Sequence, residues 1–435
     1  MLPIIQSLQY RLHGSLRAKN KQLSMSWLFQ RIAKMSLLQN VDFAAAKAKL
    51  KANEGGVEKI RDKPLIAAQK PQPIHDPFTY KKVNPERLQQ LGIFDFRNQK
   101  EPGKESIERL EQFRSHAIEI VTDPGKLACE YRNARKMAEG MKGYKKRITK
   151  PTDIVRARNR YDNIQTLEDA RVHLQVEDEE SDYINASFIH SSLETSIPSY
   201  IASQAPLKRT VSHFWQMCVE QAVNVIVMLT PYEENGKRKA DHYFPMEIGD
   251  DEVYKNTNGK SVSVSCTMKK ASEVNGLTGS LVKRVFTVSL ESKEREIEHF
   301  HFTAWPDFGN VSKPSTLLSL LDIVNENHNS SQPILTHCSA GVGRTGTYLA
   351  IDIIRKALKN VPDYEINVQQ TVSALRNQRP LMVMTVQQYA MIYRALLLWL
   401  FDTDCVASIE NDDTDDRLVS DEARYKKQRL ENFDV

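Results

Sequence analysis

The chain has 435 residues and a mass of 49.8 kDa, which suits one large domain with extensions or two medium domains. Hydrophobic residues make up 40% of the chain and charged residues 26%, and this composition excludes a chain that is disordered throughout. No run approaches the roughly 18 uninterrupted apolar residues that a membrane span requires. The longest apolar run near the end, AMIYRALLLWLF, contains Arg394.

The five cysteines are an odd number and show no disulfide spacing, and the scattered His and Cys residues show no metal-ligand spacing. We therefore expect a reducing compartment and no metal site. A cysteine with a special role is then expected to be chemical rather than structural.

The net charge of +5 combines a basic beginning with an acidic end. Residues 1–100 hold 18 Lys and Arg against 7 Asp and Glu, whereas residues 401–435 hold 5 against 11. The residues between them carry 37 of each sign and are neutral. This neutral middle gives no support for nucleic-acid binding.

The first 41 residues contain no acidic residue, and their basic residues are interleaved with serines. Apolar residues recur at helical spacing between Trp27 and Leu38, so the segment predicts an amphipathic helix. It is compatible with a mitochondrial transit peptide, with a helix on an anionic membrane, with a docking segment for a partner, or with a surface helix or tail. Residues 52–104 are rich in Lys, Pro, Gln and Asn and indicate a linker.

From residue 105 the chain alternates helical and strand patterns. Residues 105–121 predict a helix. The apolar runs at 223–230 and 332–338 predict buried central strands. A helical pattern at 213–221 precedes the strand at 223–230, and another at 345–358 follows the strand at 332–338. Residues 260–274 and 280–294 alternate like antiparallel strands. We predict a mixed α/β domain over 108–402, a basic extension over 1–107 and an acidic tail over 403–435.

The sequence PILTHCSAGVGRTG at 333–346 predicts a buried strand ending at His337, a glycine-containing loop, and a helix beginning near Thr345. Backbone N–H groups turned inward and the positive end of the helix form a cradle for an anion such as phosphate. The same field favours the thiolate of Cys338 at the base of the loop. Arg344 can donate two N–H groups to two phosphate oxygens. A thiolate beneath a bound phosphate is an in-line nucleophile.

This segment closely resembles the signature HCSAGxGRTG of the classical protein tyrosine phosphatases. The resemblance implies a twisted mixed β-sheet flanked by helices on both sides, Cys338 as nucleophile, Arg344 as phosphate clamp, and no cofactor. It implies that Thr345 offers its hydroxyl to Cys338 and that Tyr243 supports His337. The remaining loop residues would hold the substrate phosphate: Ser339, Ala340, Gly341, Val342 and Gly343.

Two upstream segments resemble the family's mobile acid loop and substrate loop. In HFTAWPDFG (301–309), Asp307 would protonate the leaving tyrosyl oxygen and then activate water, Trp305 and Pro306 would be hinge and anchor, and Phe308 would contact the substrate. In NRYDNIQTLEDARVHL (159–174), Tyr161 would wall a slot too deep for phosphoserine. The family's substrate-binding Asp is replaced by Asn163, with Asp162 one residue earlier, which puts peptide affinity or register in doubt.

In EENGKRKADHYFP (233–245), the resemblance implies that Glu234 braces Arg344 and that Lys239 contacts the acid loop. RNQRPLMVMTVQQYAMIY (376–393) departs from its family pattern at Met384, where a water-positioning Gln is expected. The second family Gln is present as Gln388, beside Gln387. Because the sulfur of Met only weakly accepts hydrogen bonds, we expect slow hydrolysis of the phosphoenzyme unless Gln387 or Gln388 substitutes. The bulky Leu381 is expected to narrow access beside the pocket.

These features predict a protein tyrosine phosphatase acting on phosphotyrosine-containing proteins. A phosphotyrosine-binding scaffold with weak turnover and a dual-specificity or phosphoinositide phosphatase are the alternatives. We expect a monomeric, cytoplasmic protein, with mitochondrial, peripheral-membrane or secreted-effector locations as alternatives and with protein or anionic-membrane docking through residues 1–41.

Overall fold

The computed structural model describes residues 82–93, 102–176, 182–190, 200–255, 261–274, 277–305, 313–328 and 332–402. The basic segment 1–41 and the acidic tail 403–435 lie outside these ranges, so the expectations placed on them stay predictions. Within the described ranges, none of the helices combines the length and apolar character needed to cross a bilayer.

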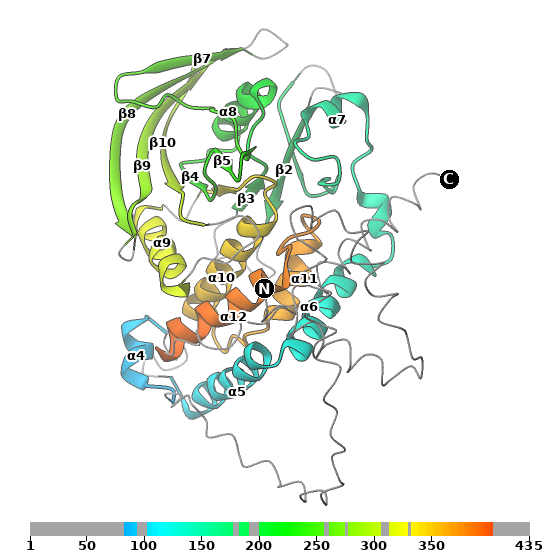
Figure 1. Cartoon of the computed structure of the whole chain (residues 1–435), viewed down its shortest axis with the longest axis vertical. Coiled ribbons are helices and arrows are strands. Elements are labelled where there is room, and N and C mark those ends of the chain that lie inside the picture. The colour runs from blue at the N-terminus through cyan, green and yellow to red at the C-terminus, as the bar shows by residue number, and fades with distance from the viewer. Residues whose placement is uncertain are drawn as a thin grey trace, which may run out of the picture. The chain divides into compact units, whose positions relative to one another are not determined.

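A nine-stranded mixed sheet forms the centre of the described part of the chain (Figure 1), in the order β1-β2-β3-β11-β4-β10-β9-β8-β7. Its four central strands, β3, β11, β4 and β10, run parallel, and the outer pairs are antiparallel. The strands are β1 (Arg171–His173), β2 (Tyr183–Ile189), β3 (Tyr200–Ser203), β4 (Val225–Met228), β7 (Asp251–Lys255), β8 (Ser261–Val274), β9 (Leu277–Leu290), β10 (Lys293–Phe302) and β11 (Ile334–His337). A separate hairpin joins β5 (Glu233–Glu234) to β6 (Lys237–Arg238).

The central strands are buried on both faces, because alternate residues enter two different cores. On β11, Ile334 joins one hydrophobic cluster and Leu335 joins the other. On β4, Val225 and Val227 face the first cluster while Ile226 faces the second. This is why both strands appear in the sequence as continuous apolar runs.

Helices cover both faces, as the resemblance predicted. The first core contains α4 (Pro85–Gln90), α5 (Lys104–Thr122), α6 (Pro124–Glu139), α9 (Pro314–Asn327), α10 (Gly343–Asn360), α11 (Val368–Arg376) and α12 (Val386–Phe401), and the second contains α8 (Val211–Glu220). Figure 1 shows α9–α12 gathered below the sheet and α8 on the side of β8–β10. The remaining helical segments are α7 (Asp153–Arg158), η1 (Tyr144–Arg147) and η3 (Lys208–Thr210).

Helix α10 is fixed to its neighbours by the buried carboxylate of Asp352. This carboxylate accepts hydrogen bonds from the Tyr200 hydroxyl at 2.9 Å, from Asn325 Nδ2 at 2.8 Å and from Lys356 Nζ at 2.7 Å. Burial opposes its ionisation, but Lys356 and the hydrogen bonds leave the pKa of Asp352 below its ordinary value. The start of β3 and the end of α9 are thereby tied to the helix that follows the phosphate-binding loop.

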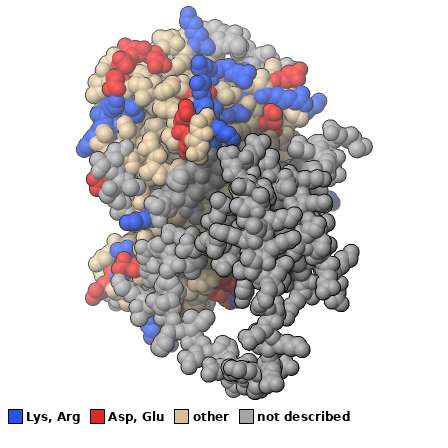
Figure 2. Space-filling model, in the orientation of Figure 1, with Lys and Arg blue, Asp and Glu red and all other residues tan. Residues whose placement is uncertain are grey.

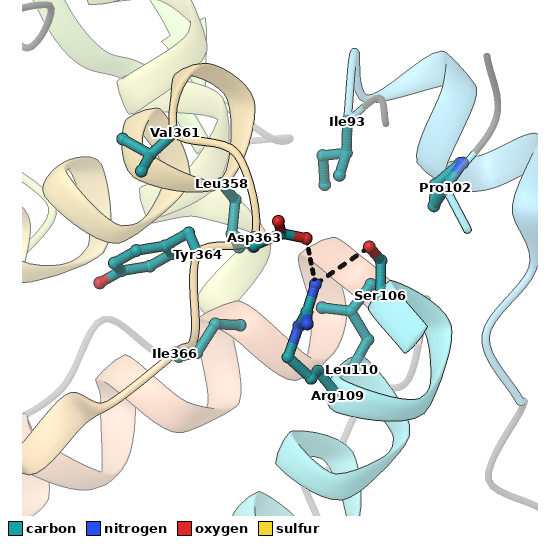
Figure 3. Close-up of a pocket in the computed structure, with 10 residues that line it drawn as sticks. All are labelled: Ile93, Pro102, Ser106, Arg109, Leu110, Leu358, Val361, Asp363, Tyr364 and Ile366. Atoms are coloured by element: carbon teal, nitrogen blue, oxygen red, sulfur yellow. Dashed lines mark hydrogen bonds and ion pairs between the residues drawn. The ribbon is translucent and has the colours of Figure 1, made fainter. Parts of the chain in front are cut away.

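The described residues before position 108 pack on the same body. Leu88 and Ile93 belong to the first core, and Arg87 donates through Nε and Nη2 to the carbonyl of Trp399 on α12. Figure 3 shows Arg109 of α5 paired with Asp363 in the α10–α11 connection, beside a small pocket; the two side chains are 2.7 Å apart. This pocket contains none of the residues predicted to act in catalysis.

The predicted elements are confirmed with small changes of boundary. The pattern at 105–121 becomes α5, the two apolar runs become β4 and β11, and the alternating segments become β8 and β9 with the start of β10. One boundary was wrong: α10 begins at Gly343 rather than near Thr345, because Gly346 N already donates to Val342 O at 3.0 Å.

Candidate active site

The predicted site lies at the carboxyl edge of the parallel strands. The segments after β3, β4 and β11 meet there, and Ala205 N donates to Ser339 O at 3.0 Å while Leu229 N donates to His337 O at 2.8 Å. In open α/β sheets this edge is where ligands bind. Chain direction alone therefore brings the loop after β11 next to residues more than a hundred positions away.

The loop from Cys338 to Val342 is held from behind by Arg379. Its guanidinium donates to Gly341 O at 2.8 Å through Nε and to Ala340 O at 3.0 Å through Nη2. Two carbonyls are thus turned away from the cradle, and Gly341 N donates inward to Cys338 Sγ at 3.2 Å. The result is a loop whose donors face the position of the thiol, as an anion site requires.

Arg379 is fully buried, and within the described residues no carboxylate pairs with it. Burial lowers the pKa of Arg379 to about 10, while Tyr183 and Cys338 raise it, so the side chain is protonated at neutral pH. Its other partners are neutral: Asn185 Oδ1 at 2.7 Å and Ser187 Oγ at 3.3 Å. The site therefore contains a buried positive charge that a bound anion compensates.

Gly341 is required by both conformation and space. Its φ is +70°, and a Cβ built there would lie 2.0 Å from Ser203 O and 2.8 Å from Gln204 N. Both atoms are backbone and cannot move aside. The loop can therefore approach β3 only with glycine at this position.

Arg344 is held in place by the predicted brace. Glu234 Oε2 accepts a hydrogen bond from Arg344 Nη2 at 2.8 Å, and Oε1 lies 2.7 Å from Nη1 as an ion pair. Arg344 Nη1 also donates to Leu229 O and to Thr230 Oγ1, each at 3.1 Å. Lys239 Nζ lies 3.9 Å from Glu234 Oε2, which places the predicted lysine beside the same carboxylate.

His337 is buried and neutral. Burial lowers the pKa of His337 to about 3, and its Nδ1 lies 3.0 Å from the carbonyl of Cys338, to which it donates. Its Nε2 therefore accepts from the Tyr243 hydroxyl, 2.7 Å away. Tyr243 also lies 2.7 Å from His299 Nε2, so the predicted Tyr243–His337 contact is formed and extends to β10.

Tyr161 connects the substrate loop to the phosphate loop. Its hydroxyl lies 2.7 Å from Ser339 Oγ, which in turn donates to Lys239 O at 2.7 Å. Asn163 and Asp162 beside it are exposed. The aromatic ring of Tyr161 therefore lies at the rim of the cradle. Asn163, which stands where the family has Asp, lies on the solvent-exposed side.

The segment before α12 is strained and tightly held. Leu381 and Val383 have φ of 65° and 56°, a region that a β-branched residue rarely adopts. Val383 O accepts from Arg376 Nη2 at 2.7 Å and from the Tyr131 hydroxyl at 3.0 Å, and Val383 N donates to Val342 O at 3.0 Å. Met384 is therefore set next to the phosphate loop by three hydrogen bonds of its neighbour.

Gln388 caps α12 in addition to lying beside the loop. Its Oε1 accepts from Met384 N at 2.9 Å and from Thr385 N at 3.3 Å. Its Nε2 makes no hydrogen bond within the described residues, and a Cβ on Gly343 would lie 2.9 Å from it. Only the amide N–H groups of Gln388 are therefore available to the site.

The acid loop is described only at its beginning. Asp307 and Phe308, with Pro306, lie outside the described residues, so their roles stay predictions. Trp305, at the last described position before them, is fully buried, which suits an anchor.

Thr345 does not make the contact that the resemblance implies. Its Oγ1 is buried without a hydrogen-bond partner in the described ranges, so the expected bond to Cys338 is not formed here.

Sequence reasoning missed the residues that support the site from behind. Arg379, Arg376, Asn185, Tyr131 and Thr230 lie inside or between the conspicuous motifs, but no local pattern assigns them a role. The available signal was the pair of arginines in RNQRPLMVM. Two arginines next to an apolar run are expected to be buried with it. Because a guanidinium only donates hydrogen bonds, a buried one needs acceptors such as backbone carbonyls.

Comparison with known proteins agrees with this geometry. The family model described as protein-tyrosine phosphatase matches residues 155–398, more than half of the chain. The chain belongs to the protein-tyrosine phosphatase family. The matched range includes Cys338, Arg344, Asp307 and the whole central sheet.

Similar proteins carry the same description. Human tyrosine-protein phosphatase non-receptor type 13 is 37% identical over 244 residues, covering 56% of this chain and 9% of that protein. Human tyrosine-protein phosphatase non-receptor type 9 is 33% identical over 270 residues, covering 58% and 43%. Tyrosine-protein phosphatase 2 of Dictyostelium discoideum is 39% identical over 223 residues, covering 50% and 54%. The chain thus spans about half or less of the length of these relatives.

The close approach at Gly341 generates a prediction about the loop. Gly341→Ala is expected to abolish phosphatase activity and to lower the melting temperature, because its Cβ meets the backbone of β3. Gly249→Ala is the matched control, since Gly249 has φ +86° and no atom lies within 4 Å of the position that a Cβ would take. Thermal unfolding and hydrolysis of p-nitrophenyl phosphate measure both effects. Equal behaviour of the two variants would show that the loop tolerates the contact.

Proposed function

We propose that this protein hydrolyses phosphotyrosine in proteins through a cysteinyl-phosphate intermediate. The observation that carries the proposal is the preformed cradle: Cys338 Sγ faces an inward N–H, and Arg344 is held by Glu234 on both of its carboxylate oxygens. Membership of the protein-tyrosine phosphatase family supports the same reaction.

The reaction has two displacement steps. The Cys338 thiolate attacks phosphorus, the bond from phosphorus to the tyrosyl oxygen breaks, and Asp307 gives its proton to that oxygen. Water then attacks the cysteinyl-phosphate, Asp307 takes its proton, and the phosphorus–sulfur bond breaks to release inorganic phosphate and the thiolate. Arg344 and the loop N–H groups stabilise the charge on the equatorial oxygens in both steps.

Tyr161 supports phosphotyrosine as the substrate. Its ring is held at the rim of the cradle by the hydrogen bond to Ser339 Oγ, where it can form the wall of a slot for an aromatic side chain. A phosphoserine side chain is too short to reach the thiol from such a rim. The whole protein's substrates are therefore phosphotyrosine-containing proteins in this proposal.

We also propose that residues 108–402 form the catalytic domain of a monomeric, cytoplasmic protein, with 1–107 and 403–435 as extensions. Within the N-terminal extension, residues 83–93 pack on that domain, because Leu88 and Ile93 lie in the first core. Free thiols at Cys129, Cys218, Cys266 and Cys338 support a reducing compartment.

A substrate panel tests the function. Wild type is expected to dephosphorylate phosphotyrosine peptides, with little turnover of phosphothreonine peptides or phosphoinositides. Cys338→Ser is expected to lose all turnover, because a hydroxyl is not ionised in the same field. Cys266→Ser, on β8 and also buried, is the matched control and should retain activity. Wild type that turns over phosphoinositides but not phosphotyrosine would overturn the proposal.

Met384 is expected to slow the second step. The Oε1 of Gln388 is occupied by Met384 N and Thr385 N, so this residue can orient water only as a donor. Rapid mixing should therefore show a burst of phenol product, and Met384→Gln should raise steady-state turnover by about tenfold, within the usual range for positioned proton transfer. Met268→Gln on β8, also partly buried, is the control. Absence of a burst, or unchanged turnover in Met384→Gln, would contradict this role.

A further inference from the structure

A basic ridge covers the end of α6 and the turn that follows it. We use this name for residues 132–150, which contain eight Lys and Arg and one acidic residue, Glu139. This is a denser charge than in the N-terminal segment, and it lies entirely in the described part of the chain. The proposed phosphatase chemistry uses none of these side chains.

Six of the eight cations on the basic ridge are exposed and make no ion pair with any described residue: Arg132, Lys136, Lys142, Lys145, Lys146 and Lys150. On the face drawn in Figure 2, by contrast, basic and acidic side chains are interspersed over the strands. Among the described residues the ridge therefore has an excess of positive charge, which favours an anionic partner.

Two large apolar side chains project from the same ridge. Met137 is 49% exposed and Met141 is 52% exposed, and they are two of the four large hydrophobic residues that are exposed in the described ranges. Met137 is exposed on the flank of α6, beside the face that buries Ala134 and Ala138. Methionines between lysines can enter the headgroup region of a bilayer while the cations contact lipid phosphates.

The basic ridge has a fixed shape. Tyr144 is buried at its centre, and backbone bonds from Met141 N to Ala138 O and from Tyr144 N to Met141 O continue the helical path beyond α6. Its far end is tied to the middle of the substrate loop by the Thr149–Thr166 hydroxyl bond at 2.8 Å and the Ile148–Leu167 bridge. A surface bound to the ridge is therefore held next to the loop that carries Tyr161.

We propose that the basic ridge docks the protein on anionic lipid surfaces. Phosphate and carboxylate headgroups compensate the six unpaired cations, and Met137 and Met141 are buried among acyl chains. Lipid fits better than an acidic polypeptide, because the exposed apolar side chains of Met137 and Met141 lie next to the exposed cations Lys136 and Lys142, so both groups can contact one bilayer surface. One such site gives weak, reversible attachment, so a second basic segment would act with it.

Vesicle sedimentation of the full chain tests the proposal. The probe is vesicles of phosphatidylcholine and phosphatidylserine, compared with phosphatidylcholine alone. Lys142→Gln/Lys145→Gln/Lys146→Gln should weaken binding to the anionic vesicles by about tenfold or more, since each cation near the surface contributes to attraction. Met137→Ser/Met141→Ser should weaken it with no change in the salt dependence.

The control removes the same charge elsewhere. Lys255→Gln/Lys270→Gln/Lys293→Gln changes three exposed lysines on β7, β8 and β10 and should leave binding within about twofold of wild type. Hydrolysis of a soluble phosphotyrosine peptide should be unchanged in all three variants.

Three results would overturn the proposal. They are equal binding of wild type to neutral and anionic vesicles, equal loss of binding in the ridge and control variants, and a ridge variant that loses binding to polyglutamate while keeping its binding to vesicles. Each is independent of whether the protein is a phosphatase, because the readout is binding rather than turnover.

Discussion

A buried cation that pairs with no carboxylate among the described residues is the constraint on which the site depends. Arg379 has no exposed surface, and its hydrogen bonds go to two loop carbonyls, one amide and one hydroxyl. Burying such a charge is costly unless every donor is satisfied. The phosphate loop and Asn185 supply the hydrogen-bond acceptors. Because two loop carbonyls point toward Arg379, the N–H group of Gly341 can point inward to the thiol.

The rest of the site follows from this arrangement. Asn185 donates to Asn159 Oδ1 and Ile164 O, each at 2.8 Å, so the guanidinium is linked to the substrate loop on either side of Tyr161. A second buried cation, Arg376, stabilises the strained Val383, which donates to the end of the phosphate loop. The neutral His337 adds no charge of its own, because burial keeps its pKa low. The positive field at the thiol therefore comes from fixed groups.

The fold and the position of the phosphate loop were predictable because each has a local pattern. The apolar runs of β4 and β11 and the alternation of β8 and β9 indicate strands from the sequence alone, and the glycines around Cys338 indicate an anion loop. The brace from Glu234 to Arg344 followed from the family resemblance. In contrast, the supporting network joins residues such as Asn185 and Arg379, which lie 194 positions apart. The hydrophobic periodicity of a sequence gives no information about a contact between two residues so far apart.

The strain at Val383 and the capping role of Gln388 could not be predicted from the sequence either. Each depends on where α12 begins relative to α10, which is a property of helix packing. A pattern predicts that a helix exists, but its cap decides which atoms of Gln388 remain available.

Binding of inorganic phosphate to Arg379→Lys, measured by calorimetry, tests the central claim most directly. An ammonium cannot donate to both loop carbonyls and to Asn185 in the same fixed plane, so we predict a dissociation constant raised by about tenfold to a hundredfold. Arg158→Lys is the control, because Arg158 is also buried and donates to Tyr183 O away from the loop. Unchanged phosphate affinity in a folded Arg379→Lys protein would contradict the account.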